Sequence, residues 1–178
     1  MMRSPAFLRR FRRDQKGLSA VEFALLAPVM ILLYFGMVEL CQAYMAQKRM
    51  SHVASIVADL TARAEVVNQS GLDDTFNIGG QVMQPFSVPP LSMRVSSVTR
   101  GDDDVVRVNW SYGRGLGPIS GELTVPDGLI DKKQSLIVSE AVYDYDSPID
   151  RFLPGITKMS RTFYLRPRSV ETVVCSNC

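Results

Sequence analysis

The longest run of apolar residues lies close to the N-terminus. Residues 23–38 form a stretch of sixteen without a charge, and between Leu18 and Val38 only Glu22 is charged. A helix needs about 20 predominantly apolar residues to cross a bilayer. A buried helix of a globular core is the alternative at this length. The pattern favours a transmembrane segment over residues 18–40.

The helical pattern continues beyond this segment. No glycine or proline occurs between Gly36 and Gly71, which predicts one helix over residues 18–66, with an extramembrane half at 41–67. In that half, small and apolar residues recur at alternating steps of three and four, which places them on one face. They are Ala43, Ala46, Met50, Val53, Val57, Leu60 and Ala64. This stripe is predicted to pack on the protein's own domain, on neighbouring copies, or on both at different turns.

Two residues inside the apolar half bear on helix packing. Pro28 removes one backbone hydrogen bond and can kink the helix, which membrane helices tolerate because their neighbours satisfy the freed carbonyl. Gly36 permits close approach of a second helix, although one glycine is a weak signal for this. Both are predicted helix-packing positions.

A linker with turn signals is predicted at residues 68–71. A short helix over 72–84 follows, with Asp73 or Asp74 as its N-cap and with two adjacent glycines, Gly79 and Gly80, that weaken it.

From Leu91 onward the hydrophobic period changes to two. Strands are predicted at 93–99 and 105–112, joined by a hairpin at 100–104, with further strands at 122–125, 136–145 and 159–166. In the second strand, the alternating apolar residues from Val106 to Tyr112 are expected on one face. The fold class is therefore α+β: a long N-terminal membrane-spanning helix supports a small antiparallel sheet of about four strands, within a domain at 68–178.

Charge is distributed unevenly along the chain. Residues 1–17 contain six basic side chains and one acidic side chain, whereas the remainder contains fourteen basic and seventeen acidic ones. A basic end suits nucleic acid or a membrane, and the adjoining apolar run decides for the membrane. Because positive flanks stay cytoplasmic, the body beyond Glu39 is predicted to lie outside the cytoplasm.

The apolar segment is predicted to remain in the mature protein. A secretory signal would carry a small-residue cleavage site just after the apolar run. The first such pattern here, Ala62-Arg63-Ala64, comes more than twenty residues too late. Any cleavage is therefore expected in front of the apolar run.

The junction between the basic leader and the apolar run carries the most informative motif. Four residues separate Gly17 from Glu22-Phe23, which lies at the start of the apolar run. A carboxylate at the edge of a transmembrane segment is costly unless it is paired. Glu22 is either a functional group or a marker of the membrane interface. The layout resembles that of class III prepilins, whose leaders are cut after the glycine on the cytoplasmic side.

Residues 16–64 resemble, more narrowly, the N-terminal signature of TadE-like proteins, and residues 72–100 resemble it more loosely. TadE-like proteins are minor pilins, or pseudopilins, of the tight-adherence pilus. The residues that carry the resemblance are Gly17, Ala20, Val21, Glu22, Phe23, Ala24, Pro28, Gly36, Glu39 and Arg63.

The resemblance implies a pilin-like fold and a role in pilus assembly or initiation. The implied leader is 1–17, cut by a prepilin peptidase between Gly17 and Leu18, with Glu22 and Phe23 setting assembly and register among subunits. It further implies a bacterial inner-membrane location, a periplasmic domain, and partners among major pilins, minor pilins and inner-membrane assembly proteins. An unprocessed single-pass protein with a periplasmic binding or scaffold domain is the alternative, and a secretion-system pseudopilin is a third possibility.

Three cysteines remain to be assigned. Cys175 and Cys178 are predicted to form a local disulfide in an oxidising periplasm; free thiols, metal binding or a redox role are the alternatives. Two cysteines alone make an incomplete zinc site, and the single histidine, His52, lies in the long helix. Cys41 is predicted to be inert, with lipidation or pairing between subunits as the alternative.

No catalytic, cofactor or metal site is predicted. Gly113–Gly117 is followed by Pro118 and not by a helix, so it is interpreted as a plain loop. The aspartates at 144, 146 and 150 lack the remaining ligands of a calcium loop, and 102–104 is interpreted as a solvated turn. The serines show no nucleophile elbow. The chain is therefore predicted not to be an enzyme.

Overall fold

The computed structural model describes residues 17–147 and 158–178 of the chain. By internal contacts the chain divides into two units: the first ends at Gln42 and the second is Ala43–Cys178. Apart from Gly17, the predicted leader lies outside the described residues.

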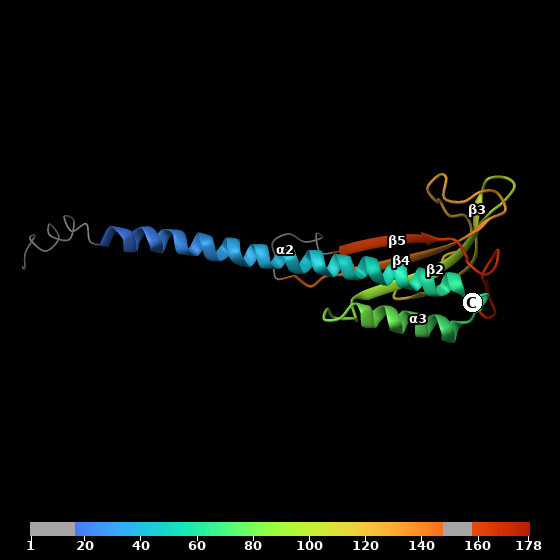
Figure 1. Cartoon of the computed structure of the whole chain (residues 1–178), viewed down its shortest axis with the longest axis horizontal. Helices are drawn as coiled ribbons and strands as arrows, with labels where there is room; N and C mark the ends of the chain where they lie inside the picture. The colour runs from blue at the N-terminus through green and yellow to red at the C-terminus, as the bar shows by residue number, and fades with distance from the viewer. Residues whose placement is uncertain (1–16, 148–157) are drawn as a thin grey trace, which may run out of the picture. The chain divides into compact units, whose positions relative to one another are not determined.

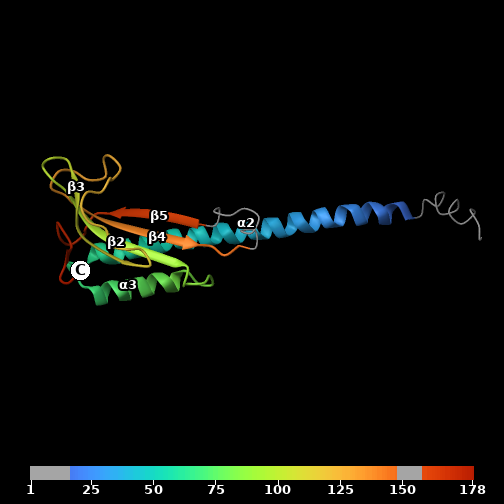
Figure 2. The same ribbon diagram turned by 180° about the vertical axis from the view of Figure 1, so that it is seen from behind.

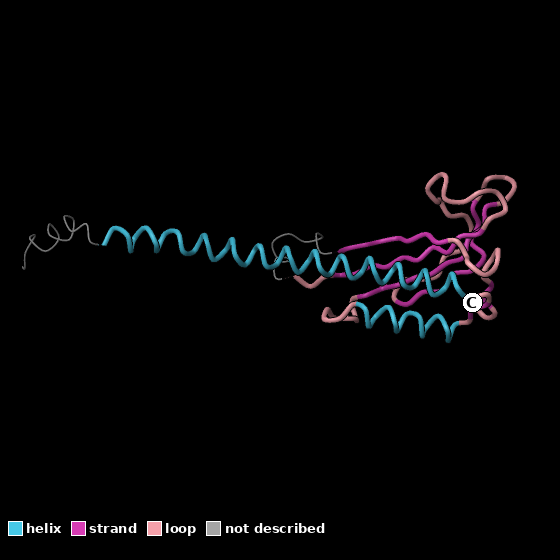
Figure 3. The backbone as a smooth tube through the Cα atoms, in the orientation of Figure 1, coloured by secondary structure: helices cyan, strands magenta, loops and turns pink. Residues whose placement is uncertain are grey.

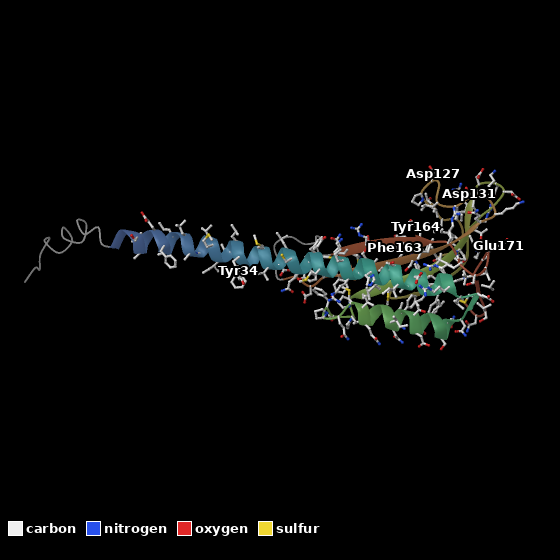
Figure 4. All side chains as sticks on the ribbon, viewed as in Figure 1. Tyr34, Asp127, Asp131, Phe163, Tyr164 and Glu171 are labelled. Atoms are coloured by element: carbon white, nitrogen blue, oxygen red, sulfur yellow. A yellow bond between two sulfur atoms is a disulfide. The ribbon has the colours of Figure 1, made fainter. Side chains whose placement is uncertain are left out.

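The predicted long helix is present as α2 (Leu18–Arg63), a single helix of 46 residues that contains Pro28 without ending there. In the first unit, none of the described side chains from Ser19 to Gln42 is buried. Large apolar side chains are exposed on all sides of this segment, and among them are Phe23, Leu25, Leu32 and Leu40. Figure 4 shows side chains, with Tyr34 labelled, projecting around the helix. The first unit therefore offers an apolar surface that the described chain leaves uncovered.

The second unit is a four-stranded antiparallel sheet with helices against it. Its strands are β2 (Leu91–Arg100), β3 (Val106–Arg114), β4 (Ser135–Asp144) and β5 (Lys158–Leu165). They lie in the order β3-β2-β4-β5, and each neighbouring pair is antiparallel (Figures 1 and 3). The predicted α+β class and antiparallel sheet are confirmed. Four of the five predicted strands are present, with ends that differ by one or two residues.

The main core lies between one face of this sheet and two helices, the second-unit part of α2 and α3 (Gln69–Val82). Both helices lie on the same side of the sheet in views from front and back (Figures 1 and 2). Side chains from all three elements are buried in this core. They include Met50, Val53 and Val57 of α2, Leu72 and Phe76 of α3, and Met93, Val95, Ile137 and Ala141 of the sheet.

A glycine permits the close approach of α3 to α2. A Cβ atom at Gly79 would lie 3.2 Å from Val53 Cγ1, from Val57 Cγ2 and from Met93 Sδ. The two glycines predicted to weaken this helix are thus buried within it, and at Gly79 packing offsets the cost of about 1 kcal/mol relative to alanine.

Strand β3 changes faces of the sheet at a bulge. Its pairing with β2 skips Asn109, so Trp110 and Tyr112 pack on the core beneath the helices. Val106 and Val108 belong to a second cluster, with Val98, Leu136 and Val138, on the opposite face. The prediction that the apolar side chains of this strand share one face is wrong, because one inserted residue reverses the alternation.

Helix α2 ends three residues earlier than predicted because the C-terminal segment caps it. The backbone N–H of Arg168 donates to Ala62 O at 2.9 Å, and the Ser169 hydroxyl donates to Arg63 O at 3.2 Å. The chain then forms β1 (Val66–Val67), which pairs in parallel with β6 (Val174–Cys175). This two-stranded sheet was not predicted.

Helix α3 begins earlier than predicted, and its cap differs. Asn68 is the N-cap: it has extended backbone angles, and its side-chain oxygen accepts a hydrogen bond from Gly71 N at 2.8 Å. The predicted linker is therefore the cap and first turn of the helix. Asp73, predicted as a cap, instead forms an ion pair with Arg114 at 2.9 Å.

The predicted strand at 122–125 is absent. Glu122 forms a single bridge with Arg107, and Val125 then turns inward to the second cluster. Gly121, at φ +85°, and Pro126 flank these four residues, so the extended pairing cannot continue in either direction.

Candidate assembly site on the N-terminal helix

The predicted cleavage junction lies at the very start of α2. Gly17 immediately precedes Leu18, the first residue of the helix, and is exposed. A Cβ atom at Gly17 would meet no atom within 4 Å. A larger side chain would therefore fit here without disturbing the described chain.

Glu22 and Phe23 lie on the exposed surface of the first turns. Phe23 is 72% exposed, and Glu22 is also exposed. Glu22 has no ion-pair or hydrogen-bond partner among the residues the structure describes. It follows Leu18 by four positions, and residues four apart in a helix lie on one face, with an axial rise of about 6 Å. A positive group at the Leu18 backbone nitrogen would therefore lie on the same face as this carboxylate.

The predicted helix-packing positions differ in burial between the two units. In the second unit, Ala46, Met50, Val53 and Val57 are fully buried in the protein's own core, and Ala43 and Leu60 are half-buried. In the first unit, Pro28 is exposed, and a Cβ atom at Gly36 would meet nothing within 4 Å. Only the first-unit positions thus remain open to another helix.

The C-terminal segment is tied to the starts of β1 and α3. Cys175 and Cys178 are joined by a disulfide with their Cα atoms 5.7 Å apart. Between them, Asn177 Oδ1 accepts a hydrogen bond from Gln69 N at 2.9 Å. Cys41 is an exposed free cysteine in the first unit. The pairing of β1 with β6 and the Asn177 contact were not predicted from the sequence. Both strands are only two residues long and carry no periodic signal.

Non-reducing peptide mapping of protein trapped in cells is expected to recover Cys175 linked to Cys178, with Cys41 alkylatable after denaturation. By the chain-entropy relation, closing so short a loop contributes about 2 kcal/mol. Reduction should therefore loosen the terminal segment without unfolding the core. Both terminal cysteines recovered as free thiols would contradict the predicted disulfide.

The remaining sequence candidates lie elsewhere in the second unit. The hydrogen bond from Arg107 lowers the pKa of Asp103 from 3.8 to about 2 in the exposed hairpin, and such exposed pairs contribute little to stability. Gly115, with φ +78°, lies in a loop against Ser92. Asp150 of the calcium candidate falls outside the described residues. Within 17–147 and 158–178, no group of three or more His, Cys, Asp or Glu side chains could hold a metal.

Comparison with known families identifies the N-terminal segment. The model of the TadE-like protein family matches residues 17–59, which is about a quarter of the chain. The chain carries a TadE-like segment. The predicted resemblance is confirmed over these residues, and the match begins at Gly17. No curated protein and no solved structure matches the chain.

The TadE-like segment also contains the membrane candidate. Among the described residues, one helix is long and apolar enough to cross a membrane, and its apolar window is not buried. This agrees with single-pass anchoring and, together with the family match, suggests involvement in the tight-adherence pilus system. Among the described residues, the segment thus combines an uncovered apolar helix with a carboxylate, Glu22, that has no partner.

Proposed function

We propose that this protein is a minor pilin, or pseudopilin, that takes part in assembly or initiation of a tight-adherence pilus. One observation carries the proposal: the TadE-like match begins at Gly17, and Glu22 lies exposed five residues later on an apolar helix. Within the described parts of the chain, Glu22 has no partner and no side chain of Ser19–Gln42 is buried. A structural role is favoured over catalysis, because the TadE-like family that matches residues 17–59 belongs to the pilus system.

In this proposal the chain is made as an inner-membrane precursor. Residues 1–17 are a cytoplasmic leader, 18–40 cross the membrane, 41–67 continue the helix outside it, and 68–178 form a periplasmic domain. The basic leader supports this orientation, because an excess of Lys and Arg stays on the cytoplasmic side. Incorporation of the mature chain into the pilus is part of the same proposal.

Cleavage by a prepilin peptidase after Gly17 would convert Leu18 into a charged N-terminus. An α-amine has an ordinary pKa of about 8, so it is mostly protonated at neutral pH. Glu22 would then pair with this amine in its own chain or in a neighbouring pilin. Such pairing reduces the cost of holding either charge in an apolar helix bundle. Pairing between chains would also set their axial register, with Phe23 packing beside the pair.

Mass spectrometry of the N-terminus tests the proposal directly. Protein purified from the membranes of its own cells is expected to begin at Leu18. The comparison sample is the same chain expressed in a host without a prepilin peptidase, which should retain the leader.

A mature chain that still begins at Met1 or Met2 in its own cells would contradict the proposal. It would select the unprocessed single-pass protein with a periplasmic scaffold domain. Cleavage within or after the apolar helix would exclude both.

A further inference from the structure

A groove lies between α2 and the edge strand β5 within the second unit. Its volume is about 360 Å³. Helix α2 contributes Tyr44, Gln47, Lys48 and Ser51, and β5 contributes Arg161, Thr162 and Phe163. Strand β5 is the last strand of the sheet on this side, with Phe163 labelled along it in Figure 4.

Both cations of this groove lack an acidic partner. No carboxylate lines the groove, and neither Lys48 nor Arg161 forms an ion pair with any described residue. Lys48 Nζ lies 5.4 Å from the centre of the Tyr44 ring, which is a cation–π contact. By contrast, Arg94, Arg107 and Arg114 of the sheet are each paired with a carboxylate.

The groove also contains unused hydrogen-bonding groups. Gln47 and Ser51 of α2 line it, and neither side chain bonds to another described residue. Two cations beside hydroxyl and amide donors are the groups that recognise a phosphate. The chemistry of the lining therefore suits a phosphate ester with further hydroxyl groups.

The groove begins soon after the apolar run. Tyr44 follows Leu40 by four residues and Lys48 follows it by eight, which is a rise of about 12 Å along α2. The headgroup layer extends roughly 5–8 Å beyond the hydrocarbon on each side of a bilayer. Lys and Arg can extend their stems toward that layer, and tyrosine is enriched at it.

We propose that the α2–β5 groove binds the headgroup of an anionic phospholipid from the membrane that α2 crosses. Lys48 and Arg161 contact the phosphate, the hydroxyl and amide side chains contact the glycerol, and Tyr44 lies at the level of the headgroups. The inference rests on the membrane placement in the proposed function. It adds a lipid contact that would hold the domain at the membrane before assembly.

An acidic protein partner is the competing occupant. The lining favours lipid, because the cores of protein interfaces are depleted of lysine and enriched in apolar contacts. Here lysine and the uncharged polar residues Gln47, Ser51 and Thr162 make up more than half of the lining residues.

The test measures lipid binding to the purified full-length chain in detergent. Native mass spectrometry would follow titration with phosphatidylglycerol, phosphatidylcholine or inorganic phosphate. Wild type is expected to bind phosphatidylglycerol most tightly and inorganic phosphate without saturation. Lys48→Gln combined with Arg161→Gln should weaken phosphatidylglycerol binding about tenfold or more, since each cation near a membrane contributes about fivefold.

A matched control uses Lys132→Gln with Arg166→Gln. These change the charge equally but lie in a different pocket, where the cations pair with Asp104 and Asp131. The control should bind phosphatidylglycerol as wild type does. Equal loss in both double variants, or no loss in either, would overturn the proposal.

Two further outcomes would also overturn the lipid assignment. Saturable binding of inorganic phosphate alone would assign the groove to a free anion. Unchanged lipid binding by the Lys48/Arg161 variant, with loss of co-purifying pilus subunits, would assign it to a protein. The assay needs no pilus and no leader cleavage. Failure of prepilin processing in cells would therefore be distinguishable from failure of lipid binding.

Discussion

Glu22→Ala is expected to leave membrane insertion and leader cleavage intact and to prevent association of the mature chain with other pilus subunits. Removing a carboxylate makes the helix start more apolar, so insertion should become easier. Association should fail because a buried α-amine would lose its partner. Breaking a buried pair costs about 3–5 kcal/mol, which is a hundredfold or greater loss, and hydration near the interface reduces this.

The measurement is co-purification of the mature variant with its subunits, together with a count of surface pili. Glu22→Gln should be intermediate, because it keeps a hydrogen-bond acceptor and loses the charge. Ser19→Ala provides a control at another exposed position of the same turns and should assemble as wild type does. Wild-type association by Glu22→Ala would show that this glutamate only marks the interface.

Gly17→Leu is expected to block maturation almost completely. A peptidase that recognises the junction has little room for a side chain at the glycine. Because a Cβ atom at Gly17 would meet nothing within 4 Å in the described chain, the substitution should not affect the fold. The loss can therefore be assigned to processing. The precursor should accumulate in the inner membrane with its 17-residue leader attached.

Immunoblotting of membrane fractions, followed by mass measurement of the N-terminus, checks this result. Gly17→Ala adds the smallest side chain and should retain more cleavage than Gly17→Leu. The Cys175–Cys178 disulfide and the melting temperature of Gly17→Leu should match those of the wild-type precursor. Maturation of Gly17→Leu to Leu18 at the wild-type rate would reject the prepilin assignment.

Much of this fold could be predicted from local patterns. The apolar run and the steps of three and four from Ala43 to Leu60 specified α2, since a 3.6-residue period recurs along a helix. Alternation specified β2 and β4 in the same way. The glycine-to-glutamate spacing at the start of α2 directed attention to Gly17 and Glu22. All these signals lie within one element and need no knowledge of its neighbours.

The tertiary structure decided the features that depend on distant contacts. Arg168 ends α2 by bonding to Ala62 O, although the chain between them spans the whole sheet. Asn109 has no register partner in β2. Val108 and Trp110 therefore lie on opposite faces of the sheet, because a single inserted residue reverses every side chain beyond it. Packing between distant elements likewise places Lys48 and Arg161, which are far apart in sequence, in one groove. Periodicity therefore determined the helices and most strands of this protein, whereas cross-strand register and long-range backbone hydrogen bonds determined where they end and which side chains meet.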